Sequence, residues 1–410
     1  MKVFLRTYGC RANQYDSEAV TAMIVASGGE IVSNAADADF AVFNSCTVTA
    51  AAESDLRSDV RKAARENPAI RSIVMGCAAG APDRDERVSP LKTLPAVEAV
   101  VAGGDATLVA SALGIRSEMA YTARQTGARA LLRIQDGCDE HCTFCATTLS
   151  RGGNRSRRPD EIVEEASQLA DAHPEIVITG IHIGTYGRDI GTSLSSLVEQ
   201  LIRRVAAVRF RLTSIEATEV DGLLRELLVS DPARVAPHLH APLQSGSNSV
   251  LRRMGRHWYT AESYAEAIEK MAKGGRFALS ADVIAGFPGE ADHDHEATVS
   301  LVESLPFTAL HVFPYSPRPG TAALRLGPHV PGETARRRAK ELRTIAERKS
   351  AAYRASRIGG DCDVVVIERT KGLTEDYLSV DVPDAFARRT RFSGRLSEAS
   401  GRLIALQSPA

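Results

Sequence analysis

Residues 138–145 read CDEHCTFC, so three of the seven cysteines, Cys138, Cys142 and Cys145, share one short segment. The spacing is C-x3-C-x2-C, and the motif follows an apolar run, Ala130–Gln135, that predicts a strand. Three thiolates can hold three irons of a [4Fe–4S] cube and leave the fourth iron open to a substrate or cofactor. Two other interpretations remain open: a zinc site with His141 as the fourth ligand, and cysteines packed in a core.

A series of short apolar runs alternating with helical patterns begins at this strand. The clearest helix is Leu194–Val205, whose apolar residues recur at helical spacing. Six βα units without a Gly-rich dinucleotide turn predict a partial (β/α)6 barrel, with its chemistry at the carboxyl ends of the strands. The five further predicted strands are Glu175–Gly184, Arg209–Ala217, His238–Gly246, Phe277–Phe287 and Ala309–Ser316.

The first part of the chain also alternates strands and helices, which predicts a parallel α/β sheet. Cys10, Cys46 and Cys77 each come just after the apolar run of a predicted strand. Because ligands in open α/β sheets bind outside the carboxyl ends of the strands, we expect these three cysteines to meet at one edge. The predicted strands are Val3–Gly9, Asp39–Cys46, Ser72–Cys77 and Ala96–Gly104, with a helix from about Ser17.

The end of the chain predicts a basic helix and a small β-domain. The stretch Arg336–Arg357 contains nine Lys or Arg residues and two Glu, whereas the whole chain has a net charge of -1. Gly359 and Gly360 end this helix, and the strand-like segments that follow predict a small β-barrel. The predicted domains are an α/β domain at 1–118, the partial barrel at 125–357 and the β-domain at 358–410.

The composition excludes several classes of protein. The 410 residues are 44% hydrophobic and 25% charged, which is typical of globular proteins and not of disordered, fibrous or disulfide-dense chains. No run of about 20 apolar residues is present, so we expect no membrane span. The N-terminus MKVFLRTYGC lacks the features of a signal peptide, and we expect a cytoplasmic location.

The cysteine motif on this predicted barrel resembles the radical S-adenosylmethionine (SAM) superfamily, in which the open iron chelates SAM. The local sequence IQDGCDEHCTFCATTLSRG, with RSR shortly after it, more narrowly resembles the methylthiotransferases. Their N-terminal domain holds an auxiliary [4Fe–4S] cluster on three cysteines. These match Cys10 in TYGCRANQYDSE, Cys46 in NSCTV and Cys77 in MGCAAG. The C-terminal segment TEDYLSVDV is similar to the TRAM domain, a small RNA-binding barrel.

Four further segments indicate the branch of this family. TGIHIGTYG, RLTSIEATEV, HLHAPLQSGSNSVLRRMGR and LHVFPYSPRPGT most resemble the branch that modifies threonylcarbamoyladenosine at tRNA position 37, next to the anticodon. Ala146–Leu149 and Ala217 depart from the family pattern, which has proline in these places. The alternatives are methylthiotransferases that act on isopentenyladenosine in tRNA or on a ribosomal-protein aspartate. A non-catalytic zinc-stabilised RNA-binding module is a further alternative.

The resemblance implies two [4Fe–4S] clusters and two molecules of SAM per turnover. One SAM methylates a sulfur held on the auxiliary cluster, and the other yields the 5′-deoxyadenosyl radical that abstracts the hydrogen from adenine carbon 2. Radical chemistry is needed because that C–H bond is not acidic. No catalytic side chain is assigned. The residues expected to contact SAM lie at strand ends or after the cysteine motif, and they are Gly180, Gly184, Glu216, Gln244, Ser245, Asp282 and Arg157.

Basic residues near the C-terminus are expected to bind RNA through its phosphates. The implied partner is the anticodon stem-loop of tRNA, from which the target base must unstack. A sulfur donor and an electron donor of the flavodoxin or ferredoxin type are also implied, and we expect a monomer. His238 and His240 share a strand face and are expected to form a structural pair. The RNA-binding candidates are Arg336, Arg337, Arg338, Lys340, Arg343, Lys371, Arg389 and Arg391.

Overall fold

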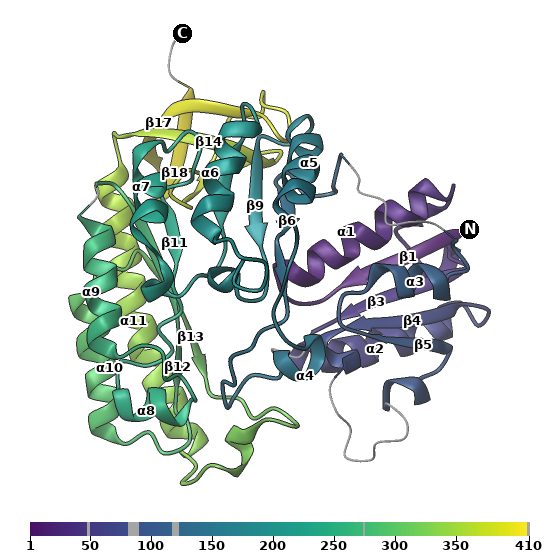
Figure 1. Cartoon of the computed structure of the whole chain (residues 1–410), viewed down its shortest axis with the longest axis horizontal. Helices are drawn as coiled ribbons and strands as arrows, with labels where there is room; N and C mark the ends of the chain where they lie inside the picture. Colours follow the sequence, from purple (N-terminus) through teal and green to yellow (C-terminus); the bar gives the residue numbers. More distant parts are fainter. Residues whose placement is uncertain (47–49, 81–89, 117–122, 274, 408–410) are drawn as a thin grey trace. The chain divides into compact units, whose positions relative to one another are not determined.

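The structure is a computed structural model that describes residues 1–46, 50–80, 90–116, 123–273 and 275–407 (Figure 1). These residues form two compact units. The cysteine motif at 138–145 belongs to the first unit, whereas the strand that precedes it belongs to the second. Unit 1 comprises Met1–Ala123, Gln135–Arg155 and Ser316–Arg325, and unit 2 comprises Arg124–Ile134, Ser156–Tyr315 and Leu326–Ala410.

Unit 1 is built on a parallel five-stranded sheet with the order β2-β1-β3-β4-β5. The central strand β3 is buried on both faces: Phe40 and Val42 pack against α1 and α3, and Ala41 and Phe43 pack against α2. Helices therefore cover both faces, as parallel sheets require. The bounds are β1 (Lys2–Thr7), α1 (Arg11–Ala26), β2 (Glu30–Val32), β3 (Phe40–Ser45), α2 (Ala50–Glu66), β4 (Arg71–Gly76), β5 (Val97–Ala102) and α3 (Ala106–Ala112).

The helix after β1 starts at Arg11, so the prediction of a start near Ser17 is wrong. The first turns of α1 carry Asn13, Asp16 and Ser17, which are polar and nevertheless buried. A helical pattern of apolar residues is therefore absent from the part of the helix closest to Cys10. Buried polar side chains need hydrogen-bonding partners, and those partners belong to the site described below.

Unit 2 contains six parallel strands in sequential order. They form two three-stranded sheets, β10-β9-β6 and β11-β12-β13. Isolated parallel bridges, Phe210 with Val235 and Ser214 with His240, join the two. This arrangement confirms the predicted open (β/α)6 series. Several strands end earlier than predicted, and their last residues form loops at the rim: β6 (Ala130–Arg133), β9 (Glu175–Thr179), β10 (Arg209–Leu212), β11 (His238–His240), β12 (Ala278–Ala285) and β13 (Ala309–Pro314).

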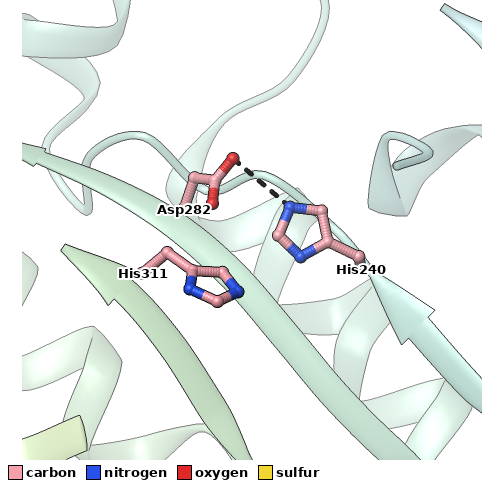
Figure 2. Close-up of side chains that lie close together, drawn as sticks. All are labelled: His240, Asp282 and His311. Atoms are coloured by element: carbon pink, nitrogen blue, oxygen red, sulfur yellow. Dashed lines mark ion pairs between the residues drawn. The ribbon is translucent and has the colours of Figure 1, made fainter. Parts of the chain in front are cut away.

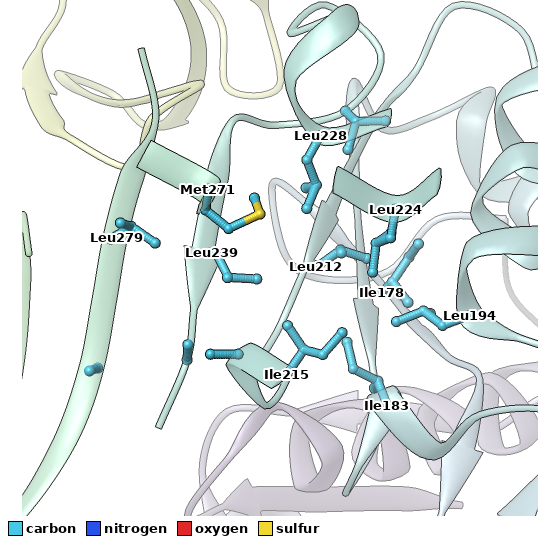
Figure 3. Close-up of a cluster of buried hydrophobic side chains, with 14 of the residues drawn as sticks. Ile178, Ile183, Leu194, Leu212, Ile215, Leu224, Leu228, Leu239, Met271 and Leu279 are labelled. Carbon is cyan, nitrogen blue, oxygen red and sulfur yellow. The ribbon is translucent and has the colours of Figure 1, made fainter. Parts of the chain in front are cut away.

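The helices of unit 2 pack on one face of these strands. Figure 3 shows the apolar side chains between them, with Leu212 and Leu239 from strands and Met271 from a helix. A fully buried side chain of this size contributes roughly 1.5–3 kcal/mol to stability. The helices are α5 (Pro159–Ala170), α6 (Leu194–Arg204), α7 (Gly222–Ser230), α8 (Asn248–Arg253), α9 (Ala261–Ala272), α10 (Asp292–Ser304) and α11 (Gly332–Arg357). No helix in the described part of the chain combines the length and apolarity needed to cross a membrane.

The opposite face of the same strands is polar. At their amino-terminal ends, Glu175 is fully buried and accepts hydrogen bonds from Arg209 Nε at 2.6 Å and Arg211 Nε at 2.8 Å. Burial alone would raise the pKa of Glu175, but the two arginines lower it well below its usual value. This end of the barrel is therefore closed by a charged network, and the carboxyl ends of the strands are left for ligands.

Residues after α11 form a closed barrel of five strands in the order β14-β15-β16-β18-β17, as the sequence predicts. Its interior contains Val364, Phe392 and Cys362, so the cysteine packs as a small apolar residue. The barrel is fixed to the rest of unit 2, because Arg357 of α11 bonds Asp376 at 2.5 Å and Arg211 donates to the Thr374 carbonyl at 3.0 Å. The strands are β14 (Asp361–Glu368), β15 (Lys371–Thr374), β16 (Ser379–Asp381), β17 (Arg391–Ala399) and β18 (Arg402–Gln407).

Candidate functional site

Three cysteines meet at the carboxyl edge of the sheet of unit 1. The strands β1, β3 and β4 are neighbours in that sheet, and Cys10, Cys46 and Cys77 follow their ends. Gly9 has φ +106°, and a Cβ at this position would lie 2.7 Å from Cys46 Sγ. The backbone next to Cys10 thus runs directly against Cys46, and only glycine permits this approach. We call these three residues the sheet trio.

The sheet trio rests on a buried hydrogen-bond network. Cys10 Sγ lies 3.2 Å from Asn13 Oδ1, which takes its hydrogen bond, and Asn13 Nδ2 donates to Asn44 Oδ1 at 2.8 Å. Asn44 Nδ2 donates in turn to the Asn13 carbonyl at 2.7 Å. Both amides are fully buried, so each holds the other in one orientation. The polar start of α1 is therefore explained by the support it gives to Cys10.

Arg151 ties Cys77 to the segment that follows the cysteine motif. Its Nε lies 3.4 Å from Cys77 Sγ, and its other nitrogens bond Asp16 at 2.6 Å and Asp136 at 3.1 Å. Burial would lower the pKa of Arg151, but the two carboxylates and Cys77 raise it, so the guanidinium stays charged. Burial raises the pKa of the Cys77 thiol to about 11, and Arg151 opposes that rise. Neither Asp16 nor Arg151 belongs to a motif that predicts this role.

The other three cysteines, Cys138, Cys142 and Cys145, form a half-buried loop that we call the loop trio. The loop lies between β7 (Gln135–Asp136) and α4 (Thr147–Arg151). It closes on itself, because Cys138 N–H donates to the Gly152 carbonyl at 3.0 Å. Gly137 has φ +72°, and a Cβ there would collide with the Gly153 carbonyl. Both trios therefore belong to unit 1, and α4 follows directly on the loop trio.

The separation of the sulfurs that a site requires differs between an iron–sulfur cluster and zinc. Tetrahedral zinc with Zn–S bonds near 2.3 Å needs sulfurs about 3.8 Å apart. A cube that takes one thiolate per iron needs a wider spacing. His141, which would have to be the fourth ligand of a zinc at the loop trio, is exposed.

Glu216 is the residue of unit 2 that best fits a ligand with a positive group. It follows β10, is 7% exposed and pairs through Oε1 with Arg256. Its Oε2 is buried and accepts no hydrogen bond from the described residues. A buried carboxylate oxygen without a hydrogen-bond donor lowers the stability of the protein. An amino or hydroxyl group of SAM would supply that donor. Gln244 has φ +63° and donates its N–H to the Asp282 carbonyl at 2.8 Å, so the loop after β11 is sharply turned here.

Three residues that are predicted to contact SAM also have structural roles. Ser245 is fully buried and bonds Thr298 Oγ1 at 3.3 Å, so it fixes the loop rather than facing a ligand. Arg157 bonds Glu165 at 2.6 Å and the Arg133 carbonyl at 2.8 Å. A Cβ at Gly184 would meet the Glu219 carboxylate, so glycine at this position lets that side chain lie close to the backbone. Gly180 follows β9 and is half-buried, which leaves it compatible with a ligand.

Asp282 lies in a cluster that the sequence analysis did not foresee. Figure 2 shows Asp282 on β12 facing His240 of β11, with His311 of β13 beside them. His240 Nε2 lies 3.3 Å from Asp282 Oδ2. His238 and His240 both contact Ser280 Oγ, at 3.1 and 2.9 Å, which confirms the predicted structural pairing. One ligand atom from each of His240, Asp282 and His311 falls within 4.8 Å of the others.

Several RNA-binding candidates are already engaged within unit 2. Arg338 is 3% exposed and bonds Glu290 and Asp292, so the prediction that it contacts RNA is wrong. Arg391 forms a fork on Asp363, at 2.8 and 2.6 Å, and Arg389 donates to the Gln125 carbonyl at 2.5 Å. Arg343 donates to the Val312 carbonyl at 2.9 Å. A sequence cannot separate such arginines from solvent-facing ones when both belong to one basic run.

Arg336, Arg337 and Lys340 are exposed on α11. A groove of about 570 Å³ lies where α11 meets the C-terminal barrel. It is lined by Arg354, Lys371 and Arg402 together with Asp381, which pairs with Lys371. The groove therefore keeps an excess of positive charge. The sequence analysis named Lys371 but missed Arg402, which lies in another strand of the barrel.

Comparisons with known proteins agree with this architecture. The family model described as "Radical SAM superfamily" matches residues 132–302, and "Uncharacterized protein family UPF0004" matches residues 2–101. A solved radical S-adenosylmethionine methyltransferase, TsrM from Kitasatospora setae, superposes with a TM-score of 0.56 at 14% identity, covering 76% of this chain and 72% of that one. The fold and the cysteine motif define a radical SAM enzyme, a class whose members use SAM and a [4Fe–4S] cluster.

Relatives with similar sequences identify the family within this class. The chain is 34% identical to the threonylcarbamoyladenosine tRNA methylthiotransferase MtaB of Bacillus subtilis, over 94% of this chain and 89% of the relative. It is 31% identical to the tRNA-2-methylthio-N(6)-dimethylallyladenosine synthase of Geobacillus thermodenitrificans, over 92% of this chain and 76% of that protein. The chain belongs to the radical SAM methylthiotransferase family, in its MtaB-like branch.

Proposed function

We propose that this chain converts N6-threonylcarbamoyladenosine at position 37 of tRNA to its 2-methylthio derivative. The observation that supports this most is the presence of two cysteine trios in one compact unit, with Arg151 reaching from α4 to Cys77. One cluster on an open site suffices to cleave SAM, and a second trio is useful where sulfur must also be supplied. The name of the Bacillus subtilis relative supports this choice of substrate.

The proposal assigns a separate role to each trio. The loop trio, Cys138, Cys142 and Cys145, would hold the cluster that binds and cleaves SAM. The sheet trio, Cys10, Cys46 and Cys77, would hold the auxiliary cluster. When bound, the clusters and SAM supply the radical and the sulfur that a non-acidic C–H bond requires, and the protein supplies position and electrostatics.

The side chains of unit 2 would bind and orient SAM. Glu216 offers an unpartnered buried oxygen to a donor group, and Arg256 holds that carboxylate in place. Gly180 directly follows β9, and Gln244 lies in the loop after β11, where the backbone can approach a ligand. Asp282 is assigned below to a different ligand group.

The RNA-binding face would consist of exposed α11 residues and the groove beside the C-terminal barrel. Arg336, Arg337 and Lys340 present flexible cations to solvent, and Arg354 and Arg402 line the groove. Such residues contact phosphates, which gives affinity that falls steeply with salt and carries little sequence information. Recognition of the target base then depends on the strand ends of unit 2.

The proposal includes the anticodon stem-loop of tRNA as partner and a monomeric chain in the cytoplasm, where tRNA is modified. It also requires an external one-electron donor of the flavodoxin or ferredoxin type and an external sulfur donor. The relative from Geobacillus thermodenitrificans supports dimethylallyladenosine as a second candidate substrate.

Mass spectrometry of tRNA nucleosides from a strain that lacks this chain tests the proposal. We expect 2-methylthio-threonylcarbamoyladenosine to disappear and its precursor to accumulate, and the intact gene to restore the product. Loss of the methylthio group from dimethylallyladenosine, or from a ribosomal-protein aspartate, would assign the chain to another substrate. Filter binding of tRNA in rising salt tests the RNA face, since Arg336→Gln and Arg337→Gln should reduce the salt dependence.

A further inference from the structure

Three polar side chains, His240, Asp282 and His311, come from three consecutive barrel strands, β11, β12 and β13. Asp282 of β12 is paired in register with His311 of β13, and His240 of β11 is paired with Ser280, two residues before Asp282. All three therefore face the side of the sheet that carries no helices. Figure 2 shows His240 and Asp282 facing each other, with the His311 ring beside them.

The three residues differ in how far they are already engaged. His240 uses both ring nitrogens, Nδ1 on Ser280 at 2.9 Å and Nε2 on Asp282 at 3.3 Å, and it is 15% exposed. Asp282 uses one oxygen on His240 and is 30% exposed. His311 is exposed, and its ring centroid lies 5.7 Å from that of His240. His240 thus positions Asp282, while His311 and the second Asp282 oxygen remain open to a ligand.

We propose that His311 and Asp282 form the subsite for the threonyl group of the substrate, with His311 donating to its carboxylate and Asp282 accepting from its hydroxyl. This inference rests on the proposed function and identifies the side chains that choose the substrate. The threonylcarbamoyl substituent ends in an anionic carboxylate and a hydroxyl, and the subsite offers one donor and one acceptor side by side. A dimethylallyl substituent is apolar and would leave both groups unpaired.

Unpaired polar groups are what makes such a subsite selective. A site that hydrogen-bonds a substrate group rejects an analogue without it much more strongly than an apolar pocket rejects an extra group. The contact to a carboxylate is charge-assisted when the imidazole is protonated, which makes it stronger than a neutral hydrogen bond. His311 is therefore expected to supply most of the discrimination, and Asp282 a smaller part.

A metal ion is the other occupant that two imidazoles and a carboxylate suggest. The observations favour substrate over metal. His240 Nδ1 already has Ser280 Oγ as its hydrogen-bonding partner, and its Nε2 lies 3.3 Å from Asp282 Oδ2, so a metal would compete with Asp282 for the one nitrogen that is left. One ligand atom from each residue lies within 4.8 Å of the others, and a metal with bonds near 2.1 Å would hold cis ligands about 3 Å apart.

A thermodynamic cycle in which one group is changed on the enzyme and one on the substrate measures the energy of the proposed contact. Two synthetic anticodon stem-loops are compared, one with threonylcarbamoyladenosine and one in which its carboxylate is a neutral carboxamide. Methylthiolated product gives kcat/KM for the reconstituted full-length enzyme, the His311→Phe variant and the His311→Gln variant. Cleavage of SAM without RNA is measured in each to report an intact barrel and cluster.

We expect the wild-type enzyme to prefer the carboxylate RNA by about 10- to 100-fold, mainly through KM. His311→Phe should remove that preference while SAM cleavage stays within about twofold of wild type. His311→Gln, which keeps an N–H donor, should retain part of it. The matched control is His293→Phe on α10, an exposed histidine beside Asp294, and it should keep the full preference.

Three results would overturn the subsite. The first is a His311→Phe enzyme that still prefers the carboxylate RNA as wild type does. The second is a wild-type preference that a chelator abolishes and added zinc restores. That result would make His240, Asp282 and His311 a metal site. The third is a wild-type enzyme that modifies neither of the two stem-loops but does modify a third one that carries dimethylallyladenosine, and that result alone would also refute the proposed function.

Discussion

The two cysteine trios of unit 1 are assembled in opposite ways. The loop trio lies within residues 138–145, and its geometry is set by one closed loop. The sheet trio is drawn from Cys10, Cys46 and Cys77, which meet only because β1, β3 and β4 are neighbours in a sheet. The loop trio depends on the spacing of its cysteines within one segment, whereas the sheet trio depends on the packing that positions three strand ends. Substitutions should therefore be able to disrupt cluster binding at one trio and leave the other intact.

The largest expected effect comes from removing one cysteine of each trio. Cys142→Ala should abolish SAM cleavage, because the loop trio would lose an iron ligand. Cys46→Ala should retain SAM cleavage and lose methylthiolation, with about half of the iron gone. Chromatography of 5′-deoxyadenosine and iron analysis measure the two. If Cys46→Ala cannot cleave SAM, the division of roles between the trios is wrong.

Arg151 is the link between the trios, and its removal should have the next largest effect. Arg151→Gln leaves the buried carboxylate of Asp16 without this cation, which should destabilise the protein by about 3–5 kcal/mol. Denaturant unfolding measures the change. Arg155→Gln is the matched control, since Arg155 is exposed and lies 3.6 Å from Asp136. It should change stability by no more than about 0.5 kcal/mol. Equal losses in both variants would contradict the role of Arg151.

The thiol of Cys77 sharpens the comparison, because it is buried while the loop trio is half-exposed. Its pKa is raised to about 11 by burial. The folded, cluster-free protein should therefore alkylate at Cys77 about 100-fold more slowly than an ordinary cysteine at pH 8. The rate should rise about tenfold per pH unit until the pKa is reached, because only the thiolate reacts. Mass spectrometry of iodoacetamide-treated protein measures the rates. A rate that does not change with pH would contradict a raised pKa of the Cys77 thiol.

Gly9 gives the smallest of the four effects. Gly9→Ala combines a strained φ with a contact against Cys46, which should destabilise the protein by about 1–3 kcal/mol and displace iron from the sheet trio only. Gly28→Ala is the matched control, because φ is +80° there and no atom lies within 4 Å of the added Cβ. It should lose stability but no iron. A Gly9→Ala protein with full iron content would show that the close approach does not shape the trio.

The sequence predicted most of what depends on pattern. Strand positions, the open (β/α)6 series, the closed C-terminal barrel and the meeting of Cys10, Cys46 and Cys77 follow from apolar runs and from the rule that parallel strand ends share an edge. The start of α1 was missed because its buried face is polar. Strand ends were predicted too long because apolar residues continue into rim loops.

Side-chain roles were predicted less well, for a physical reason. Arg338 and Arg337 are adjacent in one basic run, yet one is buried on Glu290 and the other faces solvent. Ser245 and Gln244 are adjacent in one loop, yet only the first is fully buried. Sequence reports the charge of a side chain, but its direction depends on which element packs against it.

By itself the sequence determined the cysteine chemistry, the order of the strands and the family, because spacing and periodicity are properties of the chain. Only the tertiary structure decided that Arg151 bonds Cys77, that Glu216 keeps an unpartnered oxygen, and that His240, Asp282 and His311 share one face. These contacts join residues far apart in the chain. They exist because packing places the strands in register, and no local pattern records which side chains then face each other.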